Sequence, residues 1–172
     1  MKKDKNVIVD IVISDELFVK ILQDKFNSST DYKLNTYMLC NDFINALKKT
    51  VFTKYQHHIV ILDYFISSKD GSGLKNGIEV LKHIKETDPN IEVIMLSEED
   101  DVKAASAATR VGALNFIKKN ENSFMRLHNS IKWAVSERNL RRLKRQSRAA
   151  LHLFLTIIVV IIIVVFFIYY LS

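Results

Sequence analysis

Short runs of branched aliphatic residues alternate with longer amphipathic segments along residues 1–137 of the chain. Residues 58–63 (HIVILD) hold four consecutive branched aliphatics, a pattern typical of a central parallel strand that is buried on both faces. Four further runs rich in β-branched or aromatic residues predict strands at residues 7–13, 32–39, 91–96 and 114–118.

A segment with apolar residues at helical spacing follows each predicted strand. The residues expected to begin these helices carry side-chain oxygens that accept hydrogen bonds from free backbone amides: Ser14 or Asp15, Asn41, Asn76, the acidic residues 98–101, and Asn122 or Ser123. Five strand–helix alternations predict an α/β fold with a doubly wound, five-stranded parallel sheet.

Polar side chains stand where the predicted strands end. Asp63, Ser97 and Lys119 follow three of the strands, and Asp15 follows the first. Because the carboxyl ends of parallel strands meet at one edge of a sheet, we expect these groups to lie close together, although an Asp in this position also caps turns. A carboxylate nucleophile, a hydroxyl donor and a charge-balancing ammonium form a site for a phosphoryl group on Asp63. A divalent metal would be needed there, since the phosphate donor and Asp63 are both anionic.

These residues resemble the receiver domain of two-component response regulators, the CheY-like family. The resemblance covers about residues 5–137 and rests on segments at the strand ends and helix starts: Asp63, residues 76–81 (NGIEVL), residues 93–97 (VIMLS), Gly112-Ala113, Phe116 and Lys119. It implies a flavodoxin-like sheet with strand order 2-1-3-4-5. It also implies a signalling protein and not an enzyme, beyond self-catalysed phosphorylation and dephosphorylation of Asp63.

The resemblance implies a role for each site residue. Asp63 would accept phosphate from a sensor histidine kinase or a phosphotransfer protein, and Lys119 would contact that phosphate. Ser97 and Phe116 would form the coupled switch pair that alters contacts with a downstream protein. Mg²⁺ would be the cofactor, with Asp63, Asp15 and the backbone carbonyl of Phe65 as its ligands.

The family carries two adjacent acidic residues after the first strand to hold the metal. The matching pair here is either Ile13-Ser14 or Ser14-Asp15. The helical spacing of the following apolar residues favours Ile13-Ser14, which leaves no carboxylate in either position. Asp15 would then reach the metal from one position further along, and Asp10 is a more distant candidate.

The last part of the chain has a different composition. Residues Leu153 to Leu171 include no charged residue, and this length matches the roughly 20 apolar residues that cross a membrane. Residues 138–148 hold six basic and no acidic side chains, which accounts for the whole net charge of +6. We therefore expect a receiver domain at 1–137, a basic juxtamembrane linker at 138–148 and a transmembrane tail anchor at 149–172, with the folded part on the cytoplasmic side of the inner membrane.

Two functions remain open. The first is a membrane-tethered, single-domain response regulator, which the joint presence of Asp63, Ser97 and Lys119 favours. The second is a phosphorylation-independent pseudo-receiver that acts as a membrane scaffold, which Ser14 in an acid position favours. A nucleic-acid partner is not expected, because no aromatic residues are interleaved with the basic ones in residues 138–148.

Overall fold

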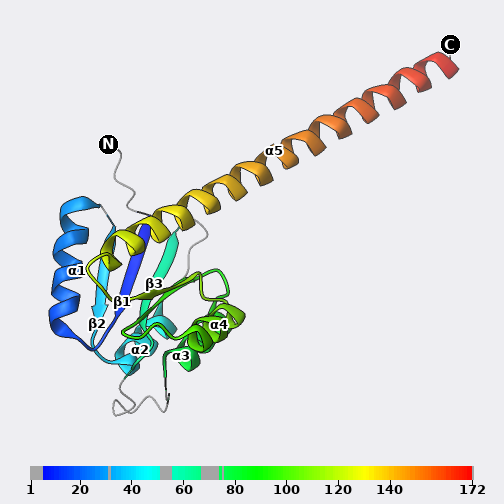
Figure 1. The fold of residues 1–172 in the computed structure, drawn as a ribbon. Helices are drawn as coiled ribbons and strands as arrows, with labels where there is room; N and C mark the ends of the chain where they lie inside the picture. Colours follow the sequence, from blue (N-terminus) through cyan, green and yellow to red (C-terminus); the bar gives the residue numbers. More distant parts are fainter. Residues whose placement is uncertain (1–5, 31, 51–55, 67–73, 75, 172) are drawn as a thin grey trace. The chain divides into compact units, whose positions relative to one another are not determined.

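The computed structural model of the chain describes residues 6–30, 32–50, 56–66, 74 and 76–171, with the backbone alone at residues 29, 141–153, 159–162, 165, 167 and 171. Strands and helices alternate along the chain (Figure 1). Their bounds are β1 (Val7–Val12), α1 (Glu16–Ser29), β2 (Lys33–Tyr37), α2 (Cys40–Lys49), β3 (His57–Asp63), α3 (Gly77–Thr87), β4 (Glu92–Ser97), α4 (Val102–Val111), β5 (Asn115–Lys118) and α5 (Ser123–Leu171).

The five strands form one parallel sheet with the order β2-β1-β3-β4-β5. This confirms the predicted fold class and strand order. All seven residues of β3 are buried, as expected for the central strand of a sheet that is covered on both faces. Asp63 is the last residue of β3 and lies beside Leu96 of β4, so its side chain stands at the carboxyl edge of the sheet.

Helices cover both faces of the sheet (Figure 1). Apolar residues of α2, α3 and α4, including Phe43, Leu81 and Ala108, pack with Val60 and Met95 into one buried cluster. On α1 and the start of α5, the rings of Phe26 and Phe124 meet edge to face with centroids 5.1 Å apart. Both layers bury their apolar faces on the central strands, which fixes the strand ends in relation to one another.

Local hydrogen bonds account for most of the helix ends. The side chain of Asn76 accepts from the backbone amides of Ile78 and Glu79 and caps α3, as predicted. Gly112 ends α4 with a left-handed φ of 106°, a conformation that glycine adopts without a Cβ clash. The predicted Asn41 cap is wrong, because α2 begins at Cys40 and the residue before it, Leu39, makes no side-chain cap bond.

Helix α5 is continuous from Ser123 to Leu171. The chain divides into two compact units, Met1–Trp133 and Ala134–Ser172. Within the part of the chain that the structure describes, no helix combines the length and the apolar character needed to cross a membrane. The anchor expected at 149–172 falls partly on residues whose side chains lie outside that description. The structure does not support the anchor, which stays a prediction.

Candidate functional site

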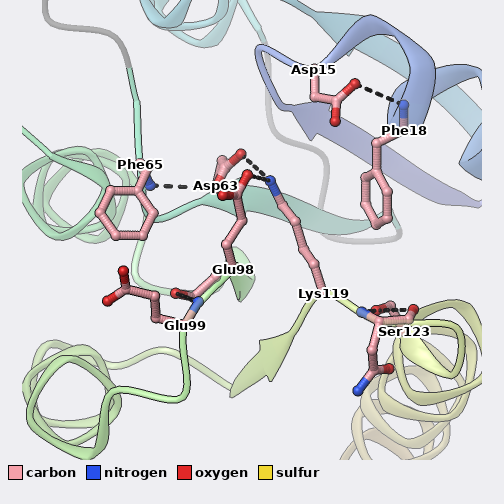
Figure 2. Close-up of polar contacts among 10 residues, drawn as sticks. Asp15, Phe18, Asp63, Phe65, Glu98, Glu99, Lys119 and Ser123 are labelled. Carbon is pink, nitrogen blue, oxygen red and sulfur yellow. Dashed lines mark hydrogen bonds and ion pairs between the residues drawn. The ribbon is translucent and has the colours of Figure 1, made fainter.

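Asp63 and Lys119 meet at the carboxyl edge of the sheet (Figure 2). The backbone amide of Lys119 donates to the carbonyl of Ser97 at 2.7 Å, which extends the β4–β5 pairing by one residue beyond β5. This bond places the Lys119 side chain over the end of β3, where Nζ lies 2.6 Å from Asp63 Oδ2. The amide of Phe65 donates to Asp63 Oδ1 at 3.3 Å. Both carboxylate oxygens therefore have a donor from the strand-end loops.

Burial dominates the electrostatics of Asp63, which is 3% exposed. Loss of solvent raises the pKa of the Asp63 carboxyl above its usual value, while the hydrogen bond and charge of Lys119 pull that pKa down. The Phe65 amide also lowers the pKa, and the charge of Glu98 raises it. The Lys119 ammonium is thus the main group that keeps a buried carboxylate charged and able to act as a nucleophile.

Lys119 has two further neighbours, Glu98 and Phe18, that were not among the predicted site residues. Glu98 Oε1 lies 3.8 Å from Lys119 Nζ, and the ring centroid of Phe18 lies 5.5 Å from the same nitrogen. Glu98 directly follows Ser97, so its position immediately after the β4 strand end is a signal that the sequence carries. Phe18 belongs to the apolar pattern of α1, and nothing in the sequence separates it from the residues that only pack.

The structure does not bring Asp15 to Asp63. The Asp15 side chain accepts from the backbone amide of Phe18 at 3.1 Å and caps α1, and Figure 2 shows it turned toward the first turn of that helix. Ile13, which follows β1, is 1% exposed and has no side-chain oxygen. Asp10 lies earlier on β1, where its carboxylate is bound to Asn35 and His58.

These residues do not fit a Mg²⁺ site of the predicted kind. Mg²⁺ requires near-octahedral oxygen ligands, usually with one or two carboxylates directed at the metal. Here the carboxylate of Asp15 is used locally, and the ammonium of Lys119 is bound between the carboxylates of Asp63 and Glu98 (Figure 2). Among the described residues, no group of three or more His, Cys, Asp or Glu side chains is placed to hold a metal. The role of the Phe65 carbonyl as a ligand stays a prediction.

The predicted switch residues lie on β4 and β5. Ser97 is buried, and its hydroxyl accepts from the amide of Glu99 at 3.2 Å. Phe116 packs edge to face on Tyr64, the residue after Asp63, with ring centroids 6.1 Å apart. This contact links β5 to the end of β3, and the coupling of Ser97 with Phe116 stays a prediction.

The chain matches the model of the response regulator receiver domain family over residues 9–132. A CheY-like receiver domain protein from Methanospirillum hungatei JF-1 shares 14% identity with a TM-score of 0.66, covering 80% of this chain and 99% of that one. The beryllofluoride-activated NtrC4 receiver domain shares 23% identity at a TM-score of 0.64, covering 76% and 98%. A receiver domain protein from Clostridium thermocellum shares 18% identity at a TM-score of 0.61, covering 78% and 98%. No curated protein matches the chain significantly.

Structural likeness at these identities shows the fold, and the family match adds the class of protein. Receiver domains are generally non-enzymatic signalling domains that interact with histidine kinases or phosphotransfer proteins. They typically bind Mg²⁺ at the acidic phosphorylation site. With the family match spanning residues 9–132 and the parallel sheet in the order β2-β1-β3-β4-β5, the chain belongs to the response regulator receiver domain family.

Proposed function

We propose that this chain is a membrane-tethered, single-domain response regulator that accepts a phosphoryl group on Asp63 and signals through protein contacts. The observation that carries this proposal is the 2.6 Å contact between Lys119 Nζ and Asp63 Oδ2 at the carboxyl edge of the sheet. A buried carboxylate held by a single ammonium is a nucleophile whose charge is balanced before the reaction begins. A sensor histidine kinase or a phosphotransfer protein would be the donor.

The transfer forms one bond and breaks one. An oxygen of the Asp63 carboxylate attacks the phosphorus of a phosphohistidine, the new O–P bond forms, and the P–N bond breaks with its electron pair left on the imidazole. The product is an acyl phosphate on Asp63, from which water later releases inorganic phosphate and the free carboxylate. Lys119 stabilises the negative charge that gathers on the phosphoryl oxygens.

Membrane attachment is the second part of the proposal, and its support comes from the sequence. The uncharged segment Leu153 to Leu171 follows six basic side chains in residues 138–148, and the basic excess favours the cytoplasmic face of the inner membrane. Attachment to a membrane raises the effective concentration of the receiver near a membrane-embedded kinase without any new contact.

One observation favours a second function, that of a phosphorylation-independent pseudo-receiver scaffold. Ser14 stands in one of the two positions where the family carries acids, whichever pair matches, and the Asp15 carboxylate caps its own helix. Such a receiver would act through its protein-binding surfaces alone. Its partners would then bind equally well whether or not a phosphate donor is present.

Intact mass spectrometry of the full chain in detergent separates the two functions. The chain is incubated with acetyl phosphate, beside the Asp63→Asn variant, in parallel with Mg²⁺ and with excess EDTA. We expect a gain of one phosphate in the parent and none in the variant, and the EDTA samples show whether that gain needs a divalent metal. No gain in any condition would favour the pseudo-receiver, and a gain that requires Mg²⁺ would show that the metal binds at this site although the Asp15 carboxylate caps its own helix.

A further inference from the structure

Glu98 is the first residue after β4, and its carboxylate lies next to the ammonium of Lys119 (Figure 2). Its Oε1 is 3.8 Å from Lys119 Nζ, and its side chain is 69% exposed whereas that of Lys119 is 10% exposed. The neighbouring Glu99 is also exposed, but its side chain points away from Lys119 (Figure 2). Glu98 is therefore the solvent-side anion of this ammonium.

The surroundings of Lys119 leave little room for a second anion. An ammonium has three N–H donors and no acceptor. One side of this ammonium faces Asp63 Oδ2 at 2.6 Å, and another faces the ring of Phe18. Glu98 lies 3.8 Å from the same nitrogen and is itself exposed to solvent. A phosphoryl group on Asp63 needs the same ammonium, so Glu98 and the phosphoryl oxygens compete for it.

We propose that Glu98 is a resident anion that occupies Lys119 in the resting protein and limits the entry of phosphate groups to Asp63. An exposed ion pair of this kind is weak, so a phosphoryl group that carries close to two negative charges displaces it. Glu98 thus slows the entry of a phosphoryl group to Asp63 without blocking it. For its role in signalling, the proposal rests on the proposed phosphorylation of Asp63.

The first test compares Glu98→Gln with Glu99→Gln, which removes the same charge one residue further along. The full chain in detergent is incubated with acetyl phosphate, and the initial rate of phosphate gain is read by intact mass. We expect Glu98→Gln to gain phosphate about fivefold faster than the parent, the most that an exposed ion pair supplies, and Glu99→Gln to match the parent. Equal rates for the two variants, or a slower rate for Glu98→Gln, would overturn the proposal.

A second test does not depend on phosphoryl transfer. In an Asp63→Asn background, Lys119 keeps only Glu98 as an anionic partner among the described contacts. The thermal midpoint is measured in inorganic phosphate and in chloride at equal ionic strength. We expect phosphate to raise the midpoint of Asp63→Asn/Glu98→Gln more than that of Asp63→Asn or Asp63→Asn/Glu99→Gln. Adding Lys119→Met should abolish the difference.

The two tests separate the two proposals. If no variant gains phosphate from acetyl phosphate but the phosphate-dependent midpoint still rises only with Glu98→Gln, phosphorylation of Asp63 fails and the resident anion stands. If phosphate shifts all of the Asp63→Asn variants equally, Glu98 does not compete for Lys119 and the inference is wrong, whatever the phosphorylation assay shows.

Discussion

Asp63 brings a carboxylate into a nearly closed site, where burial raises its pKa above the ordinary 3.8 and Lys119 acts in the opposite direction. The folded chain therefore holds the Asp63 proton up to a higher pH than the unfolded chain does. Between the two pKa values the native state binds more protons, so the contribution of Asp63 to stability falls as the pH rises through its folded pKa.

The Asp63→Asn variant removes this titration. We expect the free energy of unfolding of the variant, relative to that of the parent, to increase as the pH is raised from 3.8 through the folded pKa of Asp63. Chemical denaturation at a series of pH values measures this difference. If this free-energy difference stays flat or falls over the interval, Lys119 and not burial dominates the pKa of the Asp63 carboxyl.

A second buried carboxylate, Asp10, lies within the core on β1. Its Oδ2 is 2.5 Å from His58 Nε2, its Oδ1 accepts from Asn35 at 2.7 Å, and Asp10 and His58 are both buried. Removing one partner of such a pair leaves a buried charge that is poorly compensated, which costs more than removing both.

We expect His58→Leu to lower the free energy of unfolding by about 3 kcal/mol. The double variant Asp10→Leu/His58→Leu should lose less than the sum of the two single variants, because no carboxylate remains in the core. Urea denaturation of the four proteins completes this double-mutant cycle. Additive losses would indicate that the two side chains do not stabilise each other.

At the scale of residues, the sequence predicts the acceptor and its lysine but not the full set of neighbours. Asp63 ends β3 and Lys119 directly follows β5, and parallel strands bring their carboxyl ends to one edge of the sheet. Asp15 also follows a strand, but it has a competing local partner in the Phe18 amide. Sequence position alone does not decide between a cap and a distant ligand, because a side-chain carboxylate is suited to both.

The start of α3 supports the site at the scale of whole elements. Gly77 donates its amide to the Tyr64 carbonyl at 2.9 Å, which holds α3 against the end of β3. A Cβ on Gly77 would lie 2.4 Å from the carbonyl oxygen of Asp63 and 2.9 Å from Tyr64 Cα. Close approach of the two backbones therefore requires glycine here.

We expect Gly77→Ala to cost about 1–3 kcal/mol of stability and to slow phosphate gain on Asp63, because the end of β3 must move. Gly112→Ala is the comparison: it is strained by a φ of 106°, but its Cβ would meet only the flexible side chain of Lys85. That variant should lose stability without a change in the rate of phosphate gain. Thermal unfolding and intact mass measure the two effects, and a Gly77→Ala protein as stable and reactive as the parent would contradict the close contact.

The elements themselves are largely readable from the sequence. All five strands lie within two residues of their predicted bounds. Short runs of β-branched residues between polar segments are typical of strands in a sheet that is buried on both faces. The start of α2 is the exception. Asn41 is a good cap in isolation, but Cys40 and Phe43 pack in the core and the helix starts two residues earlier, with Leu39 in the cap position.

At the scale of the molecule, all five strands and most of the buried core belong to the unit Met1–Trp133. We expect a chain shortened to residues 1–148 to unfold cooperatively. In flotation with uncharged lipid vesicles, the full chain should rise with the vesicles and the shortened chain should not, because residues 149–172 carry the predicted membrane segment. Flotation of the shortened chain with uncharged vesicles would contradict the anchor, and loss of cooperative unfolding would show that the segment supports the fold.

Borohydride trapping identifies the residue that receives the phosphoryl group, which we propose to be Asp63. After incubation of the full chain with acetyl phosphate, borohydride reduces an aspartyl phosphate to homoserine, and peptide sequencing by mass spectrometry locates the changed residue. Phosphorylation of Asp63 predicts homoserine at position 63 in the parent, and no homoserine there when acetyl phosphate is omitted or when Asp63→Asn is used. Homoserine at another aspartate, or none in the parent, would contradict it.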